Sequence, residues 1–322
     1  MQLNTQLRWM GRVWGIASVM IMLAFVAGGA ESMRPTASEA VGLLLFPVGV
    51  VVGYMRDLWI ESQGTRLFAR EDGSGPVVVM LHGGMANHLA ALPFITPLIE
   101  RFRTITPDVR GSGKSWFGGP LTFDQLADDV QRLLDQIGVD RAVVGGVSSG
   151  SGVALRFALR HSSRALGLVL VKPVYAGEAR GYTKHQREAF AMMDAVAGRA
   201  LDEGVGVLRP LYANLPEGTR ERALAMLEGL DPASVVATSR FVASGAQPFV
   251  SAVDLTSLTR PTLLVCGDDP LHPAEVSDLY ATNIPHCTVK PASTTDIADA
   301  IGAFVDHCLQ IAAGLGPEPT RL

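Results

Sequence analysis

The stretch Ala142-Val-Val-Gly-Gly-Val-Ser-Ser-Gly-Ser-Gly152 decides the fold. A short β-branched run ends in Gly146-Val-Ser-Ser-Gly150, and a helix-forming segment follows at 153–160. A strand, a G-x-S-x-G turn and a helix in this order form a nucleophile elbow, in which flanking glycines permit a strained turn that exposes one serine hydroxyl. The pattern therefore makes Ser148 a candidate nucleophile.

Short apolar runs alternate with helical patterns on both sides of this elbow. The run Val77-Val-Val-Met-Leu81 is continuous, as expected of a central parallel strand that is covered on both faces. Further strands are expected at 65–70, 104–107, 141–147, 167–171, 262–266 and 287–290. Helices are expected between them, notably at 122–137 and 152–161. This alternation predicts an α/β fold with one doubly wound, mostly parallel sheet.

The pattern changes between Pro173 and Thr259. Helical stretches are expected at about 183–203, 217–230 and 232–245, the last beginning with Asp231 before Pro232. An all-helical insertion at about 174–258, on the carboxyl side of the sheet, would cover the serine as a lid. The alternative is an excursion of the chain that only packs and has no role in selectivity.

The first sixty residues carry two uncharged runs, at 13–30 and 40–55, and transmembrane helices are expected at about 13–30 and 40–57. The first is long enough to cross a bilayer, and the second reaches that length if it is extended through Leu58-Trp-Ile60. Arginines 8 and 12 precede the first run, and arginines 56, 66 and 70 follow the second. The positive-inside rule then predicts a transmembrane helical hairpin with both ends in the cytoplasm.

The predicted hairpin divides the chain into a membrane segment at 1–60 and a cytoplasmic α/β domain at 61–322. The alternative is a cleaved signal peptide with an apolar region at 13–27, a small-residue cleavage site at Gly28-Gly-Ala30 and an exported domain. If the hairpin forms, the lipid bilayer is an expected partner.

Composition excludes several classes of function. The chain has 27 basic and 31 acidic side chains and no basic stripe, so nucleic acid is not an expected partner. The three cysteines (266, 287 and 308) lie in apolar contexts typical of buried thiols. No Cys/His spacing is typical of a zinc site, and no metal or cofactor is expected.

Four motifs arrive in an order that resembles the α/β-hydrolases, over roughly residues 62–310. Leu81-His-Gly-Gly-Met85 follows a strand as the family's oxyanion loop does, and Asp108-Val-Arg-Gly-Ser-Gly-Lys-Ser115 is similar to its D-x-R-G-x-G-x-S segment. The elbow comes third. Gly267-Asp-Asp-Pro-Leu271 follows the strand after which the family places its acid. The resemblance implies the fold of that family and a serine nucleophile.

The resemblance also implies roles for single residues. Ser148 would be the nucleophile, and the backbone N–H of Ser149 would donate to the oxyanion together with that of Gly84 or Met85. His82 corresponds to a structural histidine of the loop. Asp269 is the candidate acid because it immediately precedes Pro270-Leu271, with Asp268 as the alternative.

The family's histidine has no counterpart at its usual place. The segment after the last expected strand carries Thr294 and Thr295, and neither can accept a proton at neutral pH. His272, three residues past Asp269, and His88, after the oxyanion loop, are the candidate surrogate bases. Loss of the base would predict a slow or repurposed site, because an oxyanion hole and binding alone retain about 10³–10⁴-fold catalysis over water.

A second glycine-rich segment imitates a phosphate-binding loop. Gly111-Ser-Gly-Lys-Ser115 matches the end of that motif, but Asp108 occupies the position of its first glycine and no helix start follows. A nucleotide is therefore not an expected ligand.

Two functions remain. The first is a membrane-anchored serine hydrolase that cleaves an ester, thioester or similar acyl bond of a small apolar substrate. Serine rather than aspartate at the elbow disfavours epoxide and haloalkane chemistry, which the resemblance associates with a carboxylate nucleophile. The alternative is a catalytically degenerate protein of this fold that binds a ligand or a partner.

Overall fold

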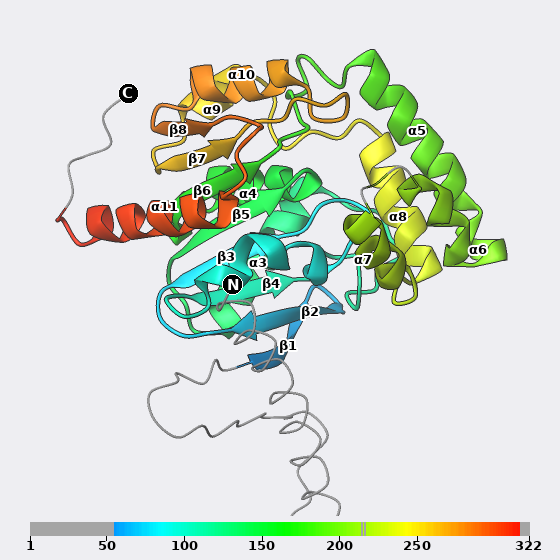
Figure 1. Cartoon of the computed structure of the whole chain (residues 1–322), viewed down its shortest axis with the longest axis horizontal. Coiled ribbons are helices and arrows are strands. Elements are labelled where there is room, and N and C mark those ends of the chain that lie inside the picture. Colours follow the sequence, from blue (N-terminus) through cyan, green and yellow to red (C-terminus); the bar gives the residue numbers. More distant parts are fainter. Residues whose placement is uncertain (1–54, 214, 216, 316–322) are drawn as a thin grey trace, which may run out of the picture. The chain divides into compact units, whose positions relative to one another are not determined.

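The computed structural model describes residues 55–213, 215 and 217–315 of the chain. Its centre is an eight-stranded sheet in the order β1-β2-β4-β3-β5-β6-β7-β8 (Figure 1). The strands are β1 (Met55–Ser62), β2 (Thr65–Asp72), β3 (Val77–Leu81), β4 (Arg103–Pro107), β5 (Ala142–Val147), β6 (Ala165–Val171), β7 (Thr262–Val265) and β8 (Cys287–Lys290). The strand β2 is antiparallel to both β1 and β4, and the pairs from β4 to β8 are parallel, so the sheet is mostly parallel, as the sequence predicts.

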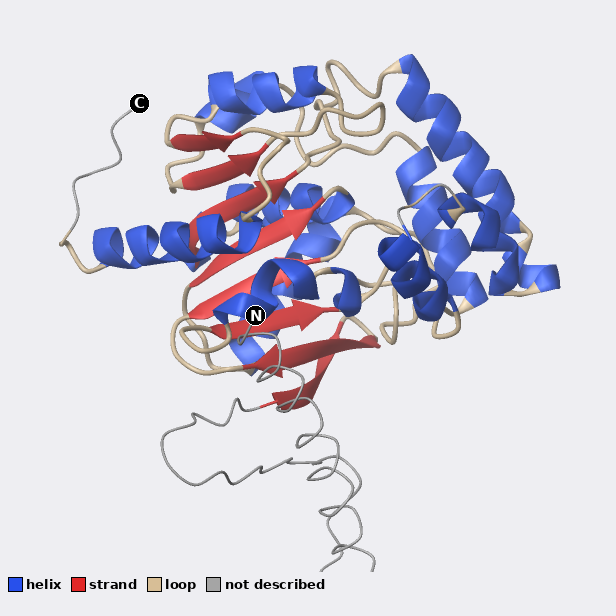
Figure 2. Ribbon diagram, viewed as in Figure 1, coloured by secondary structure: helices blue, strands red, loops and turns tan. Residues whose placement is uncertain are grey.

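Alternate side chains of β3 enter two separate cores. Val79 and Leu81 pack with α3 (Phe123–Gln136), α4 (Ser149–Arg160) and α10 (Ala274–Asn283). Val78 and Met80 pack on the other face with α2 (Leu92–Ile95), η2 (Thr96–Leu98) and α11 (Ile297–Ala312). Both faces of the central strands are therefore covered (Figure 2). This cover explains why β3 is apolar at every position.

The helical insertion lies between β6 and β7. It consists of α5 (Lys184–Gly198), α6 (Ala200–Glu203), η4 (Val205–Tyr212), α7 (Glu217–Leu227), α8 (Pro232–Ala243) and α9 (Ala252–Thr256). Helices α5–α8 lie beyond the carboxyl ends of the strands (Figure 2). Part of this layer has a small core of its own, which includes Leu208, Leu227 and Val235. Two short 3-10 helices, η1 (His88–Ala90) and η3 (Ser162–Arg164), complete the connections.

The amino-terminal boundary differs from the expected one. Residues 55–60, assigned from the sequence to the end of the second membrane span, form most of β1 and pair with β2. Ile60 is 1% exposed and belongs to the main core, which accounts for its apolar character without a membrane. The α/β domain therefore includes residues 55–60, which precede the expected boundary at Glu61.

The rest of the expected membrane segment, with the spans at 13–30 and 40–54, lies outside the described residues. Within the part that is described, no helix combines the length and the apolar character that a membrane crossing requires.

Candidate active site

Ser148 occupies a strained turn between β5 and α4. Its φ and ψ angles are 54° and −119°, in a region that side chains other than glycine rarely adopt. The two glycines of the motif make the turn sterically feasible. A Cβ atom at Gly146 would lie 2.1 Å from the Gly150 carbonyl oxygen, and one at Gly150 would lie 2.4 Å from the His82 carbonyl oxygen. The structure thus has the elbow geometry that the sequence predicts.

His272 faces the serine. Its Nε2 atom lies 2.9 Å from Ser148 Oγ, and its Nδ1 atom lies 2.8 Å and 2.9 Å from the two carboxylate oxygens of Asp269. Because a carboxylate only accepts, Nδ1 carries the ring proton and Nε2 is left to accept the proton of the serine hydroxyl. The structure therefore provides a base for Ser148.

Asp269 is fixed by the turn that also carries His272. Its Oδ1 atom accepts the backbone N–H groups of Leu271 and His272, each at 3.0 Å. Partial burial opposes ionisation, but the His272 ring and these N–H donors outweigh it and lower the pKa of the carboxyl below its ordinary value. Lys172, at the end of β6, adds a cation 3.8 Å from Oδ2. Asp268 is exposed, so the geometry favours Asp269 as the acid.

A buried lid glutamine supports this turn from above. Gln186 of α5 is fully buried, and its amide nitrogen donates to the carbonyl oxygens of Leu271 at 2.9 Å and Val174 at 3.0 Å. The position of the acid and base thus depends on a contact with the lid.

Two threonines occupy the segment in which the resemblance places the family's histidine. Thr294 and Thr295 lie in the connection between β8 and α11, where the Thr294 hydroxyl donates to the Pro291 carbonyl. The inference that the site lacks its base is nevertheless not supported, because His272 reaches Ser148 from the β7 side. Asp269 and His272 lie three residues apart in a loop, where no regular periodicity indicates which side chains face each other. The spacing therefore did not favour His272 over His88 as the base.

His88, the other candidate base, and His82 of the oxyanion loop have structural contacts. His82 Nδ1 donates to the Gly83 carbonyl at 2.7 Å, and Nε2 accepts the Val109 N–H at 3.0 Å. Complete burial lowers the pKa of His82, which keeps the ring neutral. His88 Nδ1 lies 2.8 Å from Asp108 Oδ1. The His88 ring therefore has Asp108 as its hydrogen-bond partner, and His88 is not among the residues that line the cavity beside Ser148.

The segment 108–115 folds around the Asp108 carboxylate. Oδ1 accepts the His88 backbone N–H at 2.6 Å, and Oδ2 accepts that of Lys114 at 2.7 Å. A Cβ atom at Gly113 would lie 2.2 Å from Oδ2. Burial alone would raise the pKa of Asp108, but the hydrogen bond from the His88 ring, with a smaller contribution from the Lys114 N–H, lowers it below its ordinary value. The segment thus forms a closed structural loop that holds the oxyanion loop through His88.

The oxyanion loop lies directly against the elbow. A Cβ atom at Gly83 would lie 3.4 Å from Ser148 Cβ, and one at Gly84 would lie 3.4 Å from Ser149 Oγ. Ser149 is the first residue of α4, where backbone N–H groups have no carbonyl partner within the helix. The arrangement brings Gly84 and Ser149 together as the sequence predicts, with Met85 next to them.

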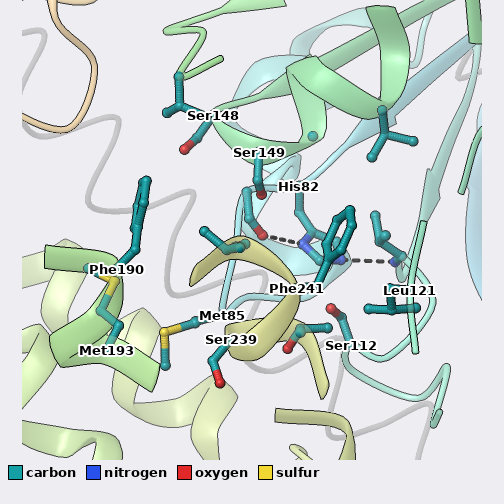
Figure 3. A pocket seen from close by; sticks show the side chains of 18 of the residues that line it. His82, Met85, Ser112, Leu121, Ser148, Ser149, Phe190, Met193, Ser239 and Phe241 are labelled. Atoms are coloured by element: carbon teal, nitrogen blue, oxygen red, sulfur yellow. Dashed lines mark hydrogen bonds between the residues drawn. The ribbon is translucent and has the colours of Figure 1, made fainter. Parts of the chain in front are cut away.

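An apolar cavity of about 210 Å³ opens beside the serine. Ser148, Met85, Phe190, Met193 and Phe241 surround it (Figure 3). Lid and sheet domain both contribute to the wall, which also includes Leu121, Phe123, Val153, Val174, Leu211, Tyr212, Thr238, Ser239 and Leu271.

Charge is neutralised around this cavity. The one arginine in its lining, Arg110, is bound to Asp129 through Nε at 2.8 Å and Nη2 at 2.6 Å. No cluster of metal-ligating side chains occurs among residues 55–213, 215 and 217–315. The cavity is therefore suited to an uncharged, apolar group.

Lid residues of the cavity wall were not singled out from the sequence. Phe190 and Met193 share one face of α5, and Phe241 lies on α8. An amphipathic helix shows which residues are apolar but not which of them face a cavity rather than a core.

Comparisons with known proteins agree with this architecture. A family model described as alpha/beta hydrolase fold matches residues 76–294. The proline iminopeptidase PfmaB of Pestalotiopsis fici is 30% identical over 118 residues, which make up 35% of this chain and 42% of that protein. Haloalkane dehalogenase 2 of Mycobacterium tuberculosis is 25% identical over 228 residues, which make up 65% of this chain and 76% of that protein.

Solved structures are similar over more of the chain. A malate-bound thermophilic esterase from Thermogutta terrifontis superposes with a TM-score of 0.62 and 25% identity, over 81% of this chain and 98% of that chain. The chain spans less than half of the length of three of its curated relatives, at 42%, 34% and 47%.

Proposed function

The chain belongs to the α/β hydrolase fold family, and from that premise we propose that it is a serine hydrolase that cleaves an ester or similar acyl bond of a small apolar substrate. The observation that carries the proposal is the hydrogen-bonded series Ser148–His272–Asp269, with distances of 2.9 Å and 2.8 Å. A nucleophile, a base and an orienting acid in this relation are the requirements for acyl transfer.

The reaction would proceed in two steps. Ser148 Oγ attacks the acyl carbon while His272 Nε2 takes its proton, and the Asp269 carboxylate stabilises the imidazolium that forms. The tetrahedral oxyanion accepts hydrogen bonds from the Ser149 N–H and from the Gly84 or Met85 N–H. His272 then returns the proton to the leaving alcohol or amine. Water, activated by the same ring, attacks the acyl-enzyme, releases the acid and restores Ser148.

The substrate class follows from the cavity. The cavity of about 210 Å³ lies below the roughly 300–1,000 Å³ of pockets that hold drug-sized ligands, so a small acyl or alkyl group would fill it. The Asp129 carboxylate neutralises the charge of the Arg110 guanidinium, and the other described residues of the wall are mostly apolar. Uncharged esters with a short apolar acyl group are therefore the favoured substrates.

Two measurements on the full chain test the hydrolase activity. A fluorophosphonate probe is expected to label the wild type and not Ser148→Ala. His272→Ala is expected to lower kcat on a p-nitrophenyl ester by about 10³–10⁴-fold, as removal of a triad member does in serine hydrolases. If the wild type is neither labelled nor active above Ser148→Ala, the ligand-binding alternative replaces the hydrolase.

We further propose that residues 13–30 tether this domain to a membrane. The support is that this run carries no charge, is long enough to cross a bilayer and follows Arg8 and Arg12. The full chain is expected to remain in the membrane fraction after washing at high salt and alkaline pH. Recovery of a soluble protein whose amino terminus begins near Glu31 would instead indicate a cleaved signal peptide.

A further inference from the structure

A tyrosine of the lid is hydrogen-bonded to the oxyanion loop. The hydroxyl of Tyr212, at the end of η4, donates to the backbone carbonyl of Met85 over 2.8 Å. The two residues are separated by 127 positions in the chain. Burial raises the pKa of Tyr212 to about 12, so the hydroxyl keeps its proton and remains a donor throughout the neutral range.

Met85 has a backbone conformation that needs such a contact. Its φ angle is +53°, in the left-handed region where residues with a side chain are strained by about 1–2 kcal/mol. Rotation of Met85 about φ and ψ turns the two peptide groups that flank it. One of them carries the Met85 N–H, a candidate oxyanion donor, and the other carries the carbonyl that Tyr212 holds.

The Met85 side chain is attached to the same part of the lid. It packs against the small core of the insertion around Leu208 and Leu227, as do Tyr212 and its neighbour Leu211. Met85 is thus bound to the lid through both its carbonyl and its side chain, although its chain neighbours Gly83 and Gly84 lie against the elbow. Figure 3 shows Met85 between Ser149 and the lid residue Ser239.

We propose that Tyr212 is a positioning residue through which the lid sets the donor geometry of the oxyanion loop. The proposal rests on the hydrolase function given above. The lid then contributes to the chemical step and not only to substrate selection, because the hydrogen bond to Met85 forms only when η4 occupies its observed position. Tyr212 acts on the oxyanion through Met85 and does not exchange a proton with the substrate.

Removal of one hydroxyl tests this role. Tyr212→Phe is expected to lower kcat on a p-nitrophenyl ester about 10-fold and to change KM less than 2-fold, which is a smaller effect than the 10²–10³-fold loss caused by deleting an oxyanion donor itself. Binding of phenylboronic acid, which forms a tetrahedral adduct with a reactive serine, should weaken by a similar factor. A substrate-like ketone that stays trigonal should bind equally well to both proteins.

Tyr280→Phe is the matched control. Tyr280 is fully buried in α10, its hydroxyl has no hydrogen-bond partner among the described residues, and it does not line the cavity. This variant loses the same atom but is expected to keep the wild-type kcat and boronate affinity. The melting temperature of both variants is measured alongside, so that a general loss of stability is recognised.

Each result has a defined meaning. An unchanged kcat in Tyr212→Phe, or a rise in KM alone, would overturn the proposal, the latter because it would place the residue in substrate binding only. An equal loss in Tyr280→Phe would overturn it as well. Failure of the wild type to react with the fluorophosphonate probe would instead remove the hydrolase function on which the proposal rests.

Discussion

Four contacts hold His272 against Asp269 within a single four-residue turn. The ring Nδ1 meets both carboxylate oxygens, the His272 backbone N–H donates to Oδ1 at 3.0 Å, and the same N–H lies 3.0 Å from the Asp269 carbonyl. The glycine before the turn is required, because a Cβ atom at Gly267 would lie 2.3 Å from the His272 carbonyl oxygen. Acid and base are therefore preorganised locally, before any contact with the serine.

Asp269→Asn is expected to lower kcat by about 10²–10⁴-fold with little change in KM. The amide nitrogen can donate to His272 Nδ1, which would favour the tautomer that has its proton on Nε2 and cannot accept from Ser148. Steady-state kinetics on a p-nitrophenyl ester measure the effect. Asp268→Asn is the matched control, since the neighbouring carboxylate is exposed, and it should retain wild-type activity. Equal losses in both variants would argue against the assigned acid.

Met193→Ala is expected to extend the range of acyl groups that the enzyme accepts. Met193 lines the cavity, and truncation to alanine leaves space for roughly three further heavy atoms of the substrate. The ratio of kcat/KM for a hexanoyl ester to that for an acetyl ester should rise several-fold. Met192→Ala, at an adjacent position that is 50% exposed, should leave the ratio unchanged. A constant ratio in Met193→Ala would show that the acyl group binds elsewhere.

Gly150→Ala is expected to destabilise the protein by more than about 3 kcal/mol. The new Cβ would lie 2.4 Å from the His82 carbonyl oxygen and 2.8 Å from that of Leu81, so backbone must move. Urea unfolding followed by circular dichroism gives the free energy. Gly198→Ala, where nothing lies within 4 Å, should stabilise by about 0.4–1 kcal/mol. A wild-type midpoint for Gly150→Ala would contradict the close packing of elbow and oxyanion loop.

Asp108→Asn is expected to destabilise the protein at pH 7 by about 1–3 kcal/mol and to flatten its acid dependence. The pKa of Asp108 is lower in the folded chain than its ordinary value of 3.8. The carboxylate therefore contributes its stabilisation above pH 3.8, and this stabilisation is lost as the pH falls below it. Melting temperatures between pH 7 and pH 3 should converge for wild type and variant. Asp140→Asn, with a side chain 90% exposed, should follow the wild type at every pH.

Local sequence patterns were sufficient for the fold and for most of the site. The elbow, the oxyanion loop and the acid loop each follow a strand, and the carboxyl ends of parallel strands meet at one edge of the sheet. Ser148, Ser149, Gly84 and Asp269 could be placed together for that reason. The two glycines at 146 and 150 could be read directly as a steric requirement of the turn.

Two features could not be predicted because they depend on tertiary contacts. Whether His272 or His88 serves the nucleophile is decided by the direction of each ring, which Asp269 fixes in one case and Asp108 in the other. The contact of Tyr212 with Met85 joins positions far apart in the chain, and no local pattern indicates it. At residues 55–60 the sequence did not separate the end of a membrane span from an edge strand, and the structure shows a strand in which Ile60 is buried.

The short spacing between acid and base has a consequence for how the site tolerates change. In the observed arrangement, the groups that transfer the proton come from two chain segments, the elbow on one side and the turn at 269–272 on the other. The connection from β8 to α11 takes no part in proton transfer. Insertions or deletions there should cost far less turnover than in an enzyme whose histidine resides in that connection.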